Sequence, residues 1–180
     1  MTWNAFHNRG EILRQVIAVA DERLDGDLPL EVPGVRDNFT GELDLLSALM
    51  LKWHARLSGN LERELMLEPL DLEAAVARAW RVASDEMPGV RAIIDRYNAQ
   101  PVDRDMATAL ERARDREWLR LAGAAGVASD ESGAAARAGA RIESAARALE
   151  PGTIHPVDLV PEQRTTPGSF VERLKAVLAA

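Results

Sequence analysis

The stretch from Thr40 to Leu67 constrains the fold more than any other part of the chain. At about 100° per residue, its large apolar side chains fall along one helical face. These residues are Leu43, Leu46, Met50, Trp53, Leu57 and Leu61. Leu45 and Leu49 widen the apolar surface over the first half of the helix. One neighbour does not cover so wide a surface, so the sequence predicts a long helix at the centre of the fold.

The same helical period recurs along the chain, whereas no segment shows the alternation typical of a strand. Thr40 and Asp71 are the expected N-caps of two successive helices, and Pro69 separates them. Residues 25–34 are dense in turn formers and should be irregular, with one helical turn at 35–39. Helices are expected over residues 4–24, 40–67, 72–87, 89–100, 103–125 and 129–149. The pattern predicts an all-α protein, an antiparallel helical bundle of four to five main helices.

The end of the chain has a different pattern. Prolines at positions 151, 156 and 161 exclude a continuous helix over residues 150–166, which should therefore be extended. Ser169 and Glu172 fit a capping box for a short last helix that ends near residue 178. The sequence thus predicts two parts, a helical bundle domain over 1–149 and an arm over 150–180. We expect this arm to pack on the bundle or on a second subunit.

Composition excludes several classes of protein. The chain has 180 residues, enough for one domain with its own core, and no cysteine, which rules out disulfides and thiolate sites. No signal peptide or membrane span is evident, so a cytoplasmic protein is expected. The abundance of alanine and arginine, with only two lysines, indicates a GC-rich bacterial genome. A net charge of −7 disfavours nucleic acid and anionic membranes, although a local basic patch is compatible with this total.

A line of polar residues flanks the apolar face of the central helix. It consists of Asp44, Ser47, His54, Ser58 and Glu62, which fall close together in angle. If neighbouring helices surround this line, it forms a ligand pocket in which His54 transfers protons or binds a metal. The simpler interpretation is the polar edge of an ordinary amphipathic helix. Both interpretations stay open at this point.

A metal site would have to combine histidines from different helices. The chain has no Glu-x-x-His pair and no H-E-x-x-H motif. The remaining arrangement places His54 and His7, and His155 as a third ligand, around one divalent ion. Three histidines in a four-helix bundle would resemble the DinB-type metal-dependent family, a resemblance carried by the helix 40–67 alone. That resemblance implies a divalent metal as cofactor and a hydrolase or transferase activity.

A second pattern, from Arg120 to Ala138, resembles a helix-turn-helix. Ala122 and Gly126 have the usual separation, but Ser132 stands where the second helix needs an apolar anchor. Acidic residues also lead that helix, where a DNA-reading helix carries cations or amides. A DNA-binding role is therefore the third choice among the functions considered.

The tryptophans at positions 3, 53, 80 and 118 each fall on an apolar stripe, so we expect them to pack in the core rather than form an aromatic ligand cage. Residues 111–120 alternate in charge and are expected to be a solvated face. No motif for phosphate binding or for a serine nucleophile is present in the sequence.

Without a catalytic motif, the sequence favours a non-catalytic protein that acts by association with itself or with another protein. The narrow seam of the helix 129–149 and the short last helix each offer little apolar surface alone. The seam consists of Ala135, Ala138, Ile142, Ala145 and Leu149, and the last helix carries Phe170, Leu174 and Leu178. The alternative is a small-molecule-binding or metal-binding bundle with His54 at its site.

Overall fold

The computed structural model describes residues 3–67, 69–127 and 133–152, and within them every regular element is a helix. This confirms the all-α class. The helices are α1 (Trp3–Arg23), α2 (Val35–Asn38), α3 (Glu42–Met66), α4 (Leu72–Glu86), α5 (Pro88–Ala99), α6 (Arg104–Ala124) and α7 (Gly133–Arg147). Their bounds lie within a few residues of those predicted from the hydrophobic period. The predicted cap Ser129, the Pro-rich segment from 153 onward and the last helix lie outside the described residues.

Side-chain caps set the start of two helices. Asp71 accepts a hydrogen bond from the backbone N–H of Ala74 at 3.0 Å, as predicted for α4. Asp103 accepts one from Met106 at 2.8 Å at the start of α6. The prediction for α3 was wrong, because its N-cap is Gly41 and not Thr40.

At the start of α3, Thr40 is a hydrogen-bond donor instead of the capping acceptor. Its backbone N–H donates to Asp44, 3.0 Å away, so the carboxylate of the first turn reaches back over the helix start. Asp44 also forms an ion pair with Arg9 of α1 at 2.7 Å. The start of α3 is thus fastened to α1 by one carboxylate.

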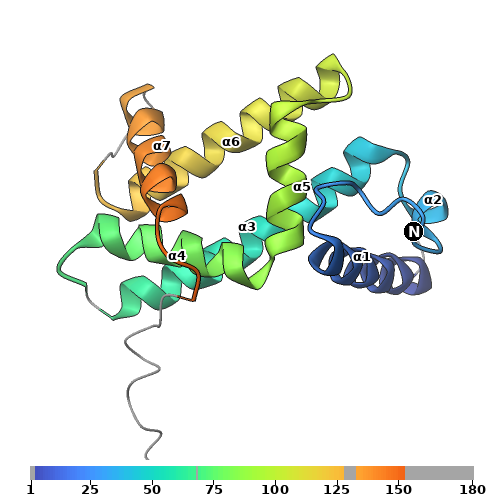
Figure 1. The fold of residues 1–180 in the computed structure, drawn as a ribbon, viewed down its shortest axis with the longest axis horizontal. Helices are drawn as coiled ribbons and strands as arrows, with labels where there is room; N and C mark the ends of the chain where they lie inside the picture. The colour runs from blue at the N-terminus through green and yellow to red at the C-terminus, as the bar shows by residue number, and fades with distance from the viewer. Residues whose placement is uncertain (1–2, 68, 128–132, 153–180) are drawn as a thin grey trace, which may run out of the picture.

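The helices pack around α3, which lies at the centre as predicted (Figure 1). α4 returns alongside α3, α6 and α7 pack on each other, and α1 packs on α5. α5 runs steeply across the line of α4 in this view. One hydrophobic cluster continues through all seven helices, with Leu45, Leu46, Leu49, Trp53 and Leu57 of α3 fully buried. No helix among the described residues is long and apolar enough to cross a bilayer.

Two glycines allow the closest helix crossings. A Cβ added to Gly139 of α7 would lie 2.0 Å from the carbonyl oxygen of Trp118 in α6. A Cβ added to Gly89 of α5 would lie 2.1 Å from the backbone of Ala20 in α1. Neither position accepts a side chain without backbone movement, so these glycines set the distances between their helices.

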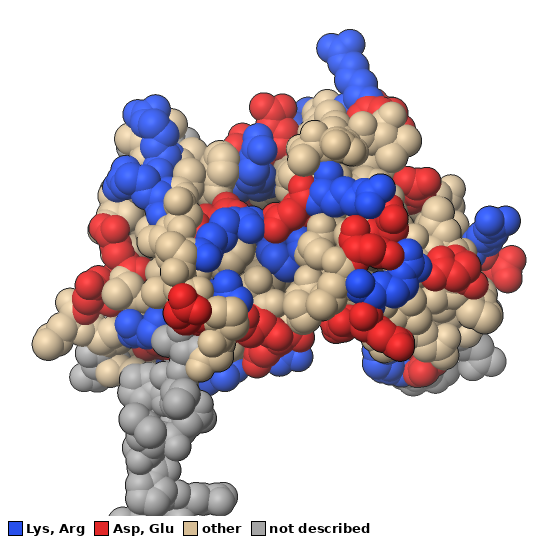
Figure 2. All heavy atoms as spheres, in the orientation of Figure 1, with Lys and Arg blue, Asp and Glu red and all other residues tan. Residues whose placement is uncertain are grey.

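The seam of α7 is covered within the monomer. Ala135, Ala138, Ile142 and Ala146 are all buried, while Ala145 is exposed, so Ala146 takes the place predicted for Ala145. Most of this seam is therefore packed inside the monomer, with Leu149 half-buried at its end. Acidic and basic side chains are interspersed over the face shown in Figure 2, where no broad region of a single charge is visible.

Candidate functional site

Glu117 is a buried carboxylate in the middle of α6, with 7 % of its surface exposed. The prediction that residues 111–120 form a solvated face was wrong at this position, although Arg112, Asp115 and Arg116 are exposed as expected. A lone buried carboxylate is strongly unfavourable unless it is paired and hydrogen-bonded. The surroundings of Glu117 supply those partners from three other helices.

Two tryptophans hold the carboxylate. Trp53 of α3 donates its indole N–H to Oε2 at 2.8 Å, and Trp80 of α4 donates to Oε1 at 2.9 Å. The two rings meet edge to face with centroids 5.6 Å apart. Both side chains are fully buried, which agrees with their predicted place in the core. The sequence pattern did not show that their N–H groups converge on one acid.

His54 provides the third contact with Glu117. Its Nε2 lies 3.2 Å from Oε2, and its side chain is 23 % exposed. An ionised carboxylate is a hydrogen-bond acceptor only, so Nε2 donates in this contact, and in the neutral form of the ring Nδ1 is then an acceptor. Within the described part of the chain, Nδ1 has no hydrogen-bond partner. His54 was singled out from the sequence, and it is the group that combines a fixed tautomer with access to solvent.

The electrostatics favour the ionised form of Glu117. Burial by itself raises the pKa of the carboxyl group, but its partners outweigh that effect and lower the pKa below the usual value. Those partners are His54, the positive charge of Arg91, and the two indole N–H groups. Glu117 is therefore a fixed negative charge inside the fold. Its two oxygens already accept from two indoles and from His54, so it is poorly suited to accept a proton from a substrate itself.

Arg91 of α5 lies across the two tryptophans and is 7 % exposed. Its guanidinium carbon is 4.9 Å from the ring centre of Trp53 and 5.6 Å from that of Trp80. One of its nitrogens is 3.7 Å from Oε1 of Glu117. This cation compensates the buried carboxylate while its flat face contacts aromatic rings.

A second set of ion pairs joins α5 to α7. Asp95 accepts from Arg91 at 2.6 Å and from Arg147 at 2.7 and 2.9 Å. Arg147 also donates to Glu143 at 2.7 and 2.9 Å, and Glu143 accepts from the indole N–H of Trp118 at 2.6 Å. Burial acts to raise the pKa of Asp95, but the two arginines lower it overall. The network thus runs from α7 through α5 to Glu117 of α6.

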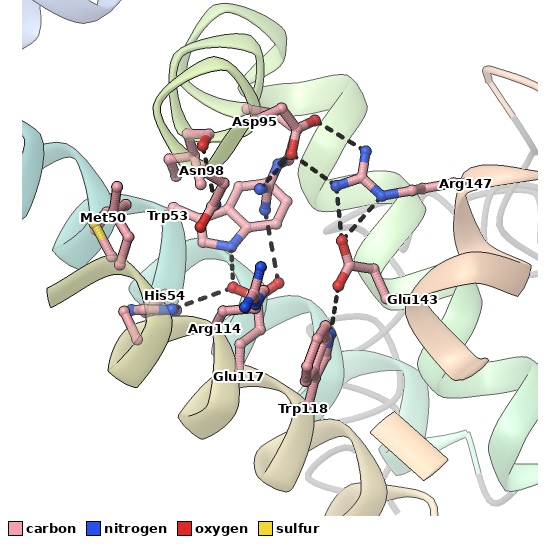
Figure 3. Close-up of a pocket in the computed structure, with 14 residues that line it drawn as sticks. Met50, Trp53, His54, Asp95, Asn98, Arg114, Glu117, Trp118, Glu143 and Arg147 are labelled. Carbon is pink, nitrogen blue, oxygen red and sulfur yellow. Dashed lines mark hydrogen bonds and ion pairs between the residues drawn. The ribbon is translucent and has the colours of Figure 1, made fainter. Parts of the chain in front are cut away.

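These groups surround a cavity of about 200 Å³, shown in Figure 3. At about 30 Å³ per water molecule, it has room for about seven waters. Arg114 also lines the cavity and is exposed, so it lies on the solvent side. It has no hydrogen bond among the described residues, and its guanidinium lies 5.0 Å from the ring centre of Trp118. The cavity is lined by Met50, Trp53, His54, Arg91, Ile94, Asp95, Asn98, Leu110, Ala113, Arg114, Glu117, Trp118, Glu143 and Arg147.

Of the polar line predicted on α3, only His54 lines this cavity. Asp44 fastens the start of α3, and Ser47 donates to the backbone carbonyl of Leu43. Ser58 accepts from Arg120 at 2.9 Å, and Glu62 is exposed. The five residues share a helical face but span about five turns, so they do not gather around one cavity.

The structure contains no cluster of three or more histidine, aspartate or glutamate side chains placed to hold a metal ion, within the residues it describes. His54 has one acidic neighbour, and that neighbour already accepts from two indoles. The side chain of His7 and the whole of His155 lie outside the described residues. The proposed convergence of three histidines therefore stays a prediction.

Comparison of the chain with models of protein families, with curated proteins and with solved structures found no match. The chemistry of the site therefore has to be argued from its geometry. The arrangement offers one titratable side chain beside a cavity, held in one tautomer by a buried acid, with an arginine at the opening.

Proposed function

We propose that this protein binds a small organic anion in the Glu117 cavity, with His54 and Arg114 as the contacting groups. The observation that carries the proposal is the histidine with a fixed tautomer. Glu117 occupies Nε2, and Nδ1 of the same ring is without a hydrogen-bond partner among the described residues. A polar group left available beside a cavity is typical of a binding site.

The walls of the cavity define the kind of ligand. Met50, Ile94 and Leu110 give it an apolar side, whereas Arg114 places a cation at the opening. Arg91 and Arg147 are already paired with acids of the network, so Arg114 is the cation left to receive a ligand. A compound with an apolar body, a carboxylate and a hydrogen-bond donor for Nδ1 fits these features.

The pair of His54 and Glu117 also supports proton transfer. A carboxylate that fixes the tautomer of a histidine stabilises the imidazolium formed when the ring takes up a proton. A ligand whose donor group lies against Nδ1 would donate a hydrogen bond to the neutral ring, and a sufficiently acidic donor would transfer its proton to Nδ1. Catalysis at this site would require that a ligand first binds against Nδ1, so binding is the property to test first.

The test follows the ring signals of His54 by NMR in protein with labelled histidine. 4-Hydroxybenzoate is the probe, because it carries a carboxylate, an apolar ring and a hydroxyl donor; 4-hydroxybenzylammonium is its cationic counterpart of similar size. 4-Hydroxybenzoate should shift the His54 signals, and Arg114→Ala should weaken its binding about tenfold, the usual loss for one charged hydrogen bond. Arg112→Ala removes an exposed arginine of the same helix and serves as the control. Preference for the cationic compound, or no His54 shift at millimolar 4-hydroxybenzoate, would contradict the proposal.

A second candidate function is association through an exposed apolar surface. Leu70, Leu72 and Val127 line a groove between the start of α4 and the end of α7, and Leu70 is fully exposed. Met66 and Leu67 add exposed apolar surface nearby in the chain. We propose self-association of the chain through this groove as the alternative. Leu70→Asp should then shift the sedimentation coefficient to that of a monomer, while Leu51→Asp, at an exposed position of α3 that does not line the groove, should not.

A further inference from the structure

A second groove, separate from the Glu117 cavity, lies between α1 and α3. Its volume is about 440 Å³, and no residue lines both sites. Four cationic side chains face it, against a single carboxylate, that of Glu86. Because the chain as a whole carries a net charge of −7, this concentration of positive charge runs against the average of the molecule. The residues are Arg14, Ile17, Lys52, Ala55, Arg56, Gly59, Asn60, Arg63, Glu86 and Met87.

Three of the cations form a line on α3. At about 100° per residue, Lys52, Arg56 and Arg63 lie within about 40° of one another around the helix axis. Gly59 falls on the same line, between Arg56 and Arg63. A glycine inside a helix costs about 1 kcal/mol relative to alanine. Nothing lies within 4 Å of a Cβ built on Gly59, so helix packing does not explain this residue. Its effect is to leave the backbone open between the cations.

A hydrogen-bonded network holds two of these cations in place. Asn60, 1 % exposed, donates to Glu86 at 2.8 Å and accepts from Arg63 at 2.6 Å. Glu86 is also 3.7 Å from Nε of Arg56. A buried amide thus links Arg63 to the acid that positions Arg56. Side chains positioned in this way lose less conformational freedom on binding than free ones.

The other two cations complete the site from either side. Lys52 has no ion pair or hydrogen bond in the described part of the chain, and it is exposed. Arg14 comes from α1 and pairs with Glu11 on its own helix. Ile17 and Met87 give the groove an apolar floor. The groove therefore combines an excess of positive charge with room for a compound to approach the backbone at Gly59.

We propose that this groove binds a small multivalent oxyanion, a phosphate-bearing or polycarboxylate compound. The charge of the groove determines the class of ligand, because each cationic side chain forms a charge-assisted hydrogen bond with an oxyanion. Arginine and lysine side chains together suit a group with several oxygens. The groove is poorly suited to nucleic acid. A protein that binds duplex DNA can pair about six to ten phosphates with cationic side chains, whereas this groove has four cationic side chains and the chain is acidic overall.

The decisive experiment compares two substitutions of similar shape. Gly59→Glu and Gly59→Gln both place a longer side chain in open space, and they differ only in charge. Tripolyphosphate is titrated into each protein and into the unchanged chain by calorimetry at physiological ionic strength. We expect Gly59→Glu to weaken binding at least tenfold relative to Gly59→Gln, because it adds a negative charge in the line of cations. Circular dichroism confirms that both variants are helical.

Lys52→Ala gives an independent measurement, because Lys52 forms no ion pair or hydrogen bond that holds the described part of the fold together. It should weaken tripolyphosphate about tenfold, the loss expected for one charged contact, while Arg112→Ala should leave binding within twofold. A second titration uses citrate in place of tripolyphosphate. Binding of tripolyphosphate alone indicates a phosphate-bearing ligand, and binding of citrate alone indicates a polycarboxylate. Either result, with these variant effects, supports the proposal. Equal affinities of Gly59→Glu and Gly59→Gln, no heat with either anion, or a preference for duplex DNA would overturn it.

Discussion

Trp53 and Trp80 donate their indole N–H groups to opposite oxygens of one carboxylate, that of Glu117, at 2.8 and 2.9 Å. The two tryptophans belong to adjacent helices, and the acid comes from a third. Their rings thus fill the core while their polar atoms satisfy a buried charge. The arrangement makes Glu117 a structural requirement as well as the group that orients His54.

Glu117→Gln should destabilise the fold by about 2–4 kcal/mol, because an amide presents a donor to one of the two indoles and removes one of the two carboxylates that face the buried Arg91. Urea denaturation followed by circular dichroism measures the change. Glu111→Gln alters an exposed acid of the same helix and should change stability by less than about 0.5 kcal/mol. Similar losses in the two variants would contradict a special role for Glu117.

Stability should fall in acid in a way that depends on Glu117. The pKa of this carboxyl group is lower in the folded than in the unfolded chain, for which 4.5 is the ordinary value. The unfolded state therefore takes up its proton first, and the stabilisation present above that value is lost as pH falls through the folded pKa. The free energy of unfolding, measured from pH 7 to pH 3, should fall less steeply in Glu117→Gln. Parallel curves would refute the assignment.

Two glycines should respond in opposite directions to the same substitution. Gly59→Ala should raise the free energy of unfolding by about 0.5–1 kcal/mol, because the added Cβ meets open space and stiffens the unfolded chain. Gly139→Ala should lower it by at least about 1–3 kcal/mol, because α6 and α7 must separate to admit the Cβ. Thermal melts of both variants give the comparison, and a common sign would show that the α6 to α7 contact is not tight.

Asp95→Asn should loosen α7 in particular. The substitution removes the charge that holds Arg147 to α5, while Arg91 keeps its contact with the two tryptophans. Hydrogen exchange should therefore accelerate in α7 more than in α3. Asp115→Asn, at an exposed position of α6, is the matched control. An even acceleration across all helices would indicate global destabilisation instead of local release.

Much of the helical framework was predictable, because periodicity and caps such as Asp71 and Asp103 act locally. Glu117 was missed because the residues just before it are charged and exposed. The helical period does offer a signal, since at about 100° per residue Glu117 falls within about 40° of Met106, Leu110 and Leu121 on the apolar stripe of α6. Thr40 illustrates a second limit. A threonine just before a helix fits two roles equally well, that of the N-cap and that of the residue whose backbone N–H donates to Asp44. The sequence alone does not distinguish these two roles. His54 was found because it belongs to the polar line beside the apolar face of α3, whereas its partner depended on how α6 packs.

The contact of both indoles with one charged group has a practical consequence. Tryptophan emission depends on the hydrogen bond at the indole nitrogen and on nearby charge, and here two of the four tryptophans share one carboxylate. The protein therefore carries its own optical reporter of events at the cavity. A change in the ionisation of Glu117, or in the position of the His54 ring, should alter emission without any added label.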